Sequence, residues 1–250
     1  MVDGAGACAD IAIPRLDDLP RLEVDGEVTF TFPEAGFTFQ ADFAPLESID
    51  PASDRCFRAR TTVLAPGQDG DFTLPAMGPP STYLVTLFGK GPQGDLSGMF
   101  VWTTSRPGPE TTPTAYLGIA WDRHGQVDGS HGLNLSVSGL ARTPTEATAT
   151  ITATAANGKS VTIDAGKASL GCPAEGSVSW WESGESRSQK VVGLGPAPFT
   201  YDATLVLDGV SYHATATWPD DHVDDPFNDD SAPVPLNFSP ALPGLPGPSG

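Results

Sequence analysis

Apolar and polar residues alternate with a period of two through most of the chain, most clearly over residues 194–218. Two alternating runs flank Asp208-Gly209, a dipeptide typical of a two-residue hairpin turn. With this turn the apolar residues meet on one face, in the pairs Leu207–Val210, Leu205–Tyr212, Ala203–Ala214 and Tyr201–Ala216. The opposite face is polar and carries Thr200, Asp202, Thr204, Ser211, His213, Thr215 and Thr217. A one-residue slip would destroy this match, so the pattern predicts a well-specified register.

A weaker copy of the same order of signals occurs earlier in the chain. Both copies have Gly-Pro, then Thr-Tyr, then a strand, a Gly-containing turn and a strand that ends in Trp. The first copy runs from Gly78 through Tyr83 to Trp102, and the second from Gly195 through Tyr201 to Trp218. Similar spacing in both copies indicates an internal repeat of about one domain length.

The first half of the chain contains further short alternating runs. Residues 27–32 and 37–43 alternate, and a four-residue loop between them would pair Phe32 with Phe37, Phe30 with Phe39 and Val28 with Ala41. We therefore predict a second hairpin with an aromatic inner face. Residues 56–64 form another expected strand, with Phe57, Ala59 and Val63 on one face and Arg58 and Arg60 on the other.

The second half shows the same alternation of apolar and polar residues, with turn signals between the runs. Strands are expected at residues 116–121, 133–137, 147–155, 177–181 and 190–192, before the closing hairpin. At Asn157-Gly158 a two-residue loop would place Ala153 against Thr162. A three-residue loop is preferred because it restores the apolar pairs Ala155–Val161 and Ala153–Ile163.

Many short strands with regularly spaced turn signals predict an all-β protein of tandem antiparallel sandwiches. Gly78-Pro-Pro-Ser-Thr-Tyr83-Leu-Val85 resembles the entry to strand F of immunoglobulin-like and fibronectin-like domains, where a tyrosine forms the tyrosine corner. Val85 stands at that family's cysteine position, so the resemblance implies no inter-sheet disulfide there. The first half as a whole resembles such modules in secreted bacterial proteins. The resemblance is one of fold and brings no catalytic residue.

The expected division is a first sandwich with its leader over residues 1–105, a linker over 106–113, a second sandwich over 114–240 and a Pro/Gly tail over 241–250. Proline and glycine are dense in the linker, so it should be extended and fairly stiff.

Charge and cysteine content narrow the possible functions. The net charge is -18 with only 13 Lys and Arg, which disfavours nucleic acid and anionic membrane surfaces as partners. No apolar run is long enough to span a bilayer, and the first residues lack a signal peptide, as in a mature secreted chain that begins with an added Met. Of the three cysteines, Cys8 and Cys56 are expected to form a disulfide, and Cys172 to be free. An alternative for Cys8 is a lipid-anchored cysteine.

Motifs for nucleophilic, metalloprotease and phosphate-binding chemistry are missing, so no catalytic residue is predicted. The Gly-rich residues 89–95 are interpreted as a hairpin loop, and His213 as a solvated strand residue. Weak calcium binding is one interpretation of the acidic segment 219–231, and a solvated loop is the favoured one. Its candidate ligands are Asp220, Asp221, Asp224, Asp225, Asp229 and Asp230.

Two adjacent tryptophans give one candidate contact residue. In a strand Trp180 would share the core-facing side with Val178, and Trp181 would share the polar side with Ser179. Trp181 is therefore expected to be an exposed stacking platform for a ligand, unless a loop covers it.

The expected function is a non-enzymatic binding or adhesion protein, secreted or attached to the cell envelope, whose partner is a protein or a glycan at the cell surface. Alternatives are a sugar-binding accessory module of a polysaccharide-active system, and an enzyme whose site shows no motif. The sequence predicts neither the identity of the partner nor the oligomeric state.

Overall fold

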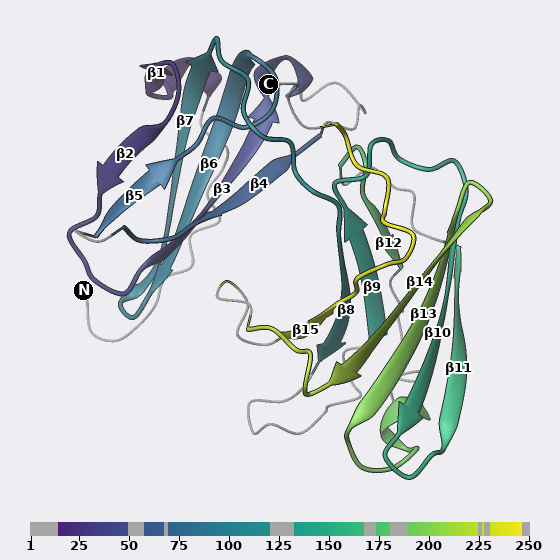
Figure 1. The fold of residues 1–250 in the computed structure, drawn as a ribbon. Helices are drawn as coiled ribbons and strands as arrows, with labels where there is room; N and C mark the ends of the chain where they lie inside the picture. Colours follow the sequence, from purple (N-terminus) through teal and green to yellow (C-terminus); the bar gives the residue numbers. More distant parts are fainter. Residues whose placement is uncertain are drawn as a thin grey trace.

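The computed structural model describes residues 15–49, 58–67, 70–120, 133–167, 174–180, 190–224, 227 and 231–246. These residues form two β-sandwiches, one from each half of the chain (Figure 1). One hydrophobic core is built from buried residues between Phe37 and Trp102, and the other from buried residues between Ala115 and Leu236. The all-β prediction is confirmed.

The first sandwich packs a five-stranded sheet against a two-stranded one. The larger sheet has the order β1-β7-β6-β3-β4 and the smaller one is β2-β5. All pairs are antiparallel except β1 with β7. Two short 3₁₀ turns, η1 and η2, accompany the strands. The bounds are η1 (Leu16–Asp18), β1 (Arg21–Glu23), β2 (Val28–Thr31), β3 (Thr38–Pro45), η2 (Leu46–Ser48), β4 (Arg60–Leu64), β5 (Asp71–Leu74), β6 (Ser81–Gly91) and β7 (Gly94–Thr104).

The second sandwich packs two four-stranded sheets, with the orders β11-β10-β13-β14 and β12-β9-β8-β15. Every pair in both sheets is antiparallel. The bounds are β8 (Thr114–Ala120), β9 (Leu133–Ser138), β10 (Ala147–Ala155), β11 (Ser160–Lys167), β12 (Val178–Trp180), β13 (Phe199–Leu207), β14 (Val210–Trp218) and β15 (Ser231–Pro235). This arrangement, with the last long hairpin at a sheet edge, is that of tandem immunoglobulin- and fibronectin-like sandwiches.

The closing hairpin β13–β14 has the predicted register. Leu207 pairs with Val210, and the ladder continues in step to Phe199 and Trp218. Asp208 and Gly209 have φ angles of 46° and 83°, the left-handed pair that a type I′ turn requires. The apolar face is buried apart from Val210 at the turn, and His213 lies on the exposed face.

The tyrosine corner is confirmed in the first sandwich. The hydroxyl of Tyr83 donates a hydrogen bond to the carbonyl oxygen of Pro79 at 2.5 Å. Burial raises the pKa of Tyr83, so its hydroxyl keeps its proton and remains a donor. Tyr201 occupies the matching place in β13, where burial also raises its pKa.

The predicted hairpin between residues 27–32 and 37–43 is wrong. β2 pairs with β5, whereas β3 pairs with β4 and β6 in the opposite sheet. The loop after β2 therefore crosses between the sheets. Alternation could not distinguish the two arrangements, because both point the same side chains into the core. The predicted aromatic partners still meet there, with ring centroids 4.7 Å apart for Phe32–Phe37 and 5.3 Å for Phe30–Phe39.

The face assignment of residues 56–64 is also inverted. Arg58 and Arg60 are buried, and Val63 is 56% exposed. Arg60 donates two hydrogen bonds to the carboxylate of Glu110 in the linker, at 2.8 and 3.0 Å. Arg58 donates to the carbonyl oxygen of Ala141 in the second sandwich at 2.9 Å. These hydrogen bonds offset the cost of burying the two guanidinium groups. The alternation within a strand gives no information about such partners, because they lie far away in the sequence.

The linker lies against the first sandwich. The Gly78 N–H donates to Pro109 O at 2.9 Å, and the Gly108 N–H donates to Gly78 O at 2.7 Å. A Cβ on Gly108 would lie 1.7 Å from the carbonyl oxygen of Ala76, so only glycine permits this approach. These bonds and the Arg60–Glu110 pair join the linker to the first sandwich, and Arg58 joins the first sandwich directly to the second.

Two smaller expectations for the second sandwich are corrected. The loop after β10 contains three residues, 156–158, and it pairs Ala153 with Val161 and Ile151 with Ile163. The predicted pair Ala155–Val161 would instead enclose five residues, 156–160. The observed register differs by two residues from the predicted one, a shift that leaves every side chain on its face. Residues 190–192 form a helical turn instead of a strand, with Val191 buried.

Candidate functional site

One edge of the larger sheet in the first sandwich is mostly open. β7 pairs with β6 from Gly94 to Thr104, but it pairs with β1 only from Val101 to Thr103. Along residues 94–100, β7 has no strand partner on that side within the described part of the chain. An edge of this length presents backbone donors and acceptors that natural proteins usually cover.

The backbone groups that point toward this open side follow from one hydrogen bond. The Val101 N–H donates to Pro20 O at 2.9 Å, so the backbone groups of Val101 face away from β6. In an antiparallel ladder the N–H and C=O of alternate residues point to the same side. The backbone groups of Asp95, Ser97 and Met99 therefore face the open side.

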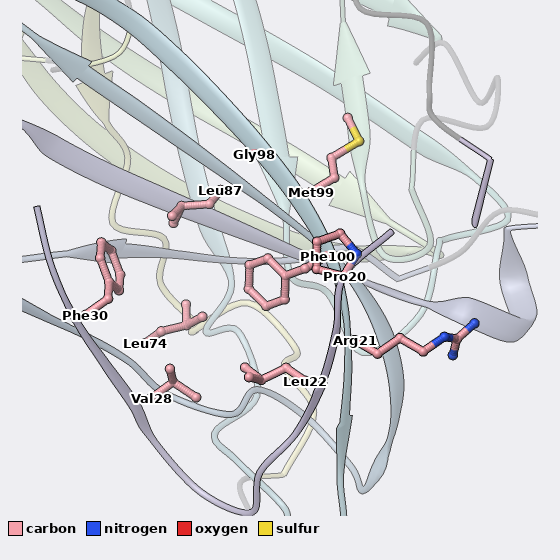
Figure 2. A pocket seen from close by; sticks show the side chains of 10 residues that line it. All are labelled: Pro20, Arg21, Leu22, Val28, Phe30, Leu74, Leu87, Gly98, Met99 and Phe100. Atoms are coloured by element: carbon pink, nitrogen blue, oxygen red, sulfur yellow. The ribbon is translucent and has the colours of Figure 1, made fainter. Parts of the chain in front are cut away.

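An apolar groove lies beside this open edge, between the two sheets. It is a cavity of about 360 Å³. Figure 2 shows the side chains of Val28, Phe30, Leu74, Leu22, Leu87 and Phe100 gathered around it, while Arg21 and Met99 point away. The full lining is Pro20, Arg21, Leu22, Val28, Phe30, Leu74, Leu87, Gly98, Met99 and Phe100.

The groove exists because of Gly98. Leu96 and Phe100 pack against the core of the first sandwich, so the position between them also faces inward. A Cβ built on Gly98 would meet nothing within 4 Å. A missing side chain at this position leaves the inner surface of β7 hollow.

The end of β1 and the turn after it are firmly anchored. Trp102 donates from Nε1 to Val24 O at 2.8 Å, and the Ser105 N–H donates to the Asp25 carboxylate at 2.8 Å. The hydrogen bond from the Ser105 N–H is the main cause that lowers the pKa of Asp25, so the carboxylate stays charged. These contacts hold the end of β1 in place. The open edge lies before the start of β1, because Arg21 pairs with Val101 and the two strands are parallel.

Three carboxylates lie on segments next to the lining strands of the groove, and none of them is part of the lining. Asp95 lies on the open edge, and Asp71 closes the β2–β5 pair opposite Thr31. Glu34 accepts a hydrogen bond from Gln93 at the tip of the β6–β7 hairpin, at 2.9 Å. None of these three carboxylates forms an ion pair with a residue that the structure describes.

The residues singled out in the sequence are not brought to this groove. Val178 and Trp180 are buried, as predicted, whereas Trp181 lies outside the described residues. Cys8, Cys56 and Cys172 also lie outside them, as do Asp225, Asp229 and Asp230. The disulfide and the exposed Trp181 therefore stay predictions.

The described part of the acidic segment forms local contacts. Asp221 accepts a hydrogen bond from the Thr217 N–H at 2.7 Å, and His222 lies 3.7 Å from Asp224. Within the described residues, no cluster of three or more His, Cys, Asp or Glu side chains could hold a metal ion. Calcium binding by Asp220, Asp221 and Asp224 with their undescribed neighbours stays a prediction. No helix in the described part is long and apolar enough to cross a membrane.

Sequence reasoning missed the groove. The sequence signal for it was Gly98, a glycine inside a predicted strand. Glycine inside a strand often marks a close approach by another chain segment.

No protein-family model matches the chain, and no curated protein matches it. A similar solved structure is described as the crystal structure of chicken CNTN1 FN1-FN3 domains, at 13% identity and a TM-score of 0.23. The match covers 80% of this chain, which spans 63% of that one. A likeness this distant implies no function, and the fold rests on the strand order described above.

Proposed function

We propose that this chain is a non-enzymatic binding protein that acts outside the cell or in the cell envelope, and that the groove of the first sandwich receives a protein ligand. The observation that carries the proposal is an apolar hollow of about 360 Å³ next to a strand edge that no described strand covers. Concave apolar surfaces of this size are typical of ligand sites. The acidic composition and the sandwich fold support an extracellular location.

The lining of the groove favours binding over catalysis, and protein over sugar. Its side chains are aliphatic or aromatic, apart from Arg21, whose guanidinium points away (Figure 2). Sugar sites need hydroxyl, amide or carboxylate partners for the ligand's many hydroxyl groups, because an unpaired polar group in an apolar site is costly. A sugar-binding function would therefore depend on another surface, such as the one expected around Trp181.

The test presents the purified full chain to a glycan array and to a displayed library of random peptides. Gly98→Leu is the informative variant, because its side chain fills the groove without touching the exterior of the sheet. We expect peptide ligands whose binding Gly98→Leu abolishes. Glycan binding that Gly98→Leu leaves unchanged, without any peptide ligand, would contradict the proposal and favour the sugar-binding alternative.

A further inference from the structure

We propose that the ligand of the groove is an extended peptide segment, apolar at alternate residues and basic at one end, which adds as a strand beside residues 94–100 of β7. This inference rests on the proposed function and specifies the partner. The open edge offers the backbone N–H and C=O groups of Asp95, Ser97 and Met99 in strand geometry. Strand addition satisfies such a row of groups, whereas a globular ligand leaves it unpaired.

The second sandwich shows what fills the corresponding side of a closed domain. There the tail after Trp218 runs between the edges of the two sheets. It pairs with β8 as β15, and Ser239 then exchanges two backbone hydrogen bonds with His213 of β14, at 2.8 and 2.9 Å. Figure 1 shows this yellow segment passing along β8 and β14.

The side chains of that tail alternate as the proposed peptide does. Val234 and Leu236 are buried, and Phe238 packs against the same core. The inward residues are therefore two apart. A strand beside β7 would place its own inward residues over Gly98, toward Val28, Phe30 and Leu87.

The charges near the open edge indicate which kind of chain segment would bind there. Asp95 lies on the open edge, directly opposite Lys90 of β6, and Glu34 and Asp71 lie near its far end. None of these three carboxylates forms an ion pair with a described residue. A segment with Lys or Arg at that end complements them. A second copy of this chain carries a net charge of -18 and would be repelled, and residues 1–14 contain Asp3 and Asp10 but no Lys or Arg. Charge complementarity therefore favours a basic foreign peptide.

The experiment uses the full chain and a fluorescently labelled synthetic peptide, acetyl-Lys-Lys-Val-Thr-Leu-Thr-Phe-Thr-amide. Anisotropy measures affinity, and amide hydrogen exchange reports the protection of residues 95, 97 and 99. We expect saturable binding that weakens with added salt and protects these amides. The same peptide with Glu in place of both Lys residues should bind about tenfold more weakly or worse.

Ser97→Pro is the decisive variant. Proline removes the N–H that faces the open side and leaves the β6–β7 ladder intact, since proline is tolerated at such edge positions. We expect Ser97→Pro to weaken peptide binding about tenfold or more, and its matched control Ser97→Ala to bind normally. Asp95→Lys should remove the preference for Lys over Glu in the peptide, whereas Asp202→Lys on the second sandwich should not.

Other outcomes overturn the inference in distinguishable ways. Binding that Gly98→Leu abolishes but Ser97→Pro leaves unchanged would retain a protein-binding groove and exclude strand addition. Concentration-dependent dimerisation that Ser97→Pro blocks, without peptide binding, would assign the edge to a second copy. Peptide binding that appears only after removal of residues 1–14 would assign it to the chain's own leader. No binding of the Lys-containing peptide by the wild-type chain would also refute the inference, and glycan binding alone would refute both proposals.

Discussion

The two sandwiches have related strand orders but differ on one side of the structure. In the second sandwich, β8 is paired on both sides, by β9 and β15, and the tail then meets β14 at one backbone bridge, between Ser239 and His213. In the first, β1 covers three residues of β7, and the remainder of that edge has no strand partner among the described residues. A covered edge contributes buried apolar area, whereas an open edge beside an apolar groove is a place for another chain.

The two domains also differ in how they fill their cores. The first relies on aromatic side chains, and Phe39 contacts the rings of Phe30, Phe32, Phe37 and Phe72. The second places mostly alanine on β10 opposite larger residues on β13, for example Ala149 opposite Leu205 and Ala153 opposite Tyr201. Large rings meeting across the sandwich hold the first domain together although its smaller sheet has only two strands.

The largest expected effect comes from removing a central tryptophan in either sandwich. Trp102 and Trp180 are 0% and 3% exposed. Trp102→Ala and Trp180→Ala should each lower the free energy of unfolding by about 3–5 kcal/mol in urea denaturation. Trp102→Ala should also release β1, because it removes the hydrogen bond to Val24 O, and hydrogen exchange at residues 101–103 would then accelerate. A loss below about 1 kcal/mol at either site would contradict the assigned cores.

A second expected effect tests the closed side of the second sandwich. Leu236 is 4% exposed and follows β15 directly. Leu236→Ala should cost about 2–5 kcal/mol of unfolding free energy, because it leaves a cavity under the tail. Leu242 is only partly buried, so Leu242→Ala should cost clearly less. Equal costs for the two variants, measured side by side, would show that the tail does not close this side as described.

A third effect has the opposite sign and concerns the open side. Gly98→Leu places apolar atoms in the groove where a Cβ meets nothing within 4 Å. Thermal or urea unfolding should show a gain of about 1 kcal/mol, because apolar surface of the groove is removed from water. A marked destabilisation would mean that the groove cannot accept a side chain, and it would remove Gly98→Leu as a test of binding.

Some features of the two sandwiches could be predicted from the sequence. The register of the β13–β14 hairpin was predictable because Asp208-Gly209 fixes the turn and one face is wholly apolar. The β2–β3 relation was not, because alternation describes which side of a strand faces the core but not which sheet the strand joins. Arg58 and Arg60 were assigned to the wrong face because their partners, Ala141 and Glu110, are distant in sequence.

The groove was beyond sequence reasoning for a related reason. It results from where β1 begins relative to β7, and from a side chain that Gly98 lacks. The alternation of apolar and polar residues shows which side chains face the core. It does not show whether a neighbouring strand covers the edge of a sheet. Recognising the site required the pairing of all the strands.

The smallest expected effect compares one turn aspartate from each sandwich. The Asp208 carboxylate accepts hydrogen bonds from the N–H groups of Glu146 and Thr145, at 3.0 and 2.8 Å, and lies 3.0 Å from Arg142. The Glu146 bond is the main cause that lowers the pKa of Asp208, as the Ser105 bond lowers that of Asp25. Both carboxylates therefore bind a proton less readily in the folded chain than in the unfolded chain.

A lowered pKa in the folded state stabilises the fold when the carboxylate is ionised. The contribution should be complete above the unfolded value, near pH 4, and should disappear as the pH falls through the lower folded value. Carbon-detected NMR titration should place both folded pKa values below that of a model aspartate, and Asp208→Asn and Asp25→Asn should each flatten the acid side of the stability profile. Each carboxylate has an arginine nearby, but Asp208 accepts from two backbone donors, whereas Asp25 accepts from one backbone donor and the Ser105 side chain. The second backbone donor should make Asp208→Asn flatten the profile more. An equal or reversed order would mean that the turn at Asp25, which anchors the end of β1, is the better preorganised of the two.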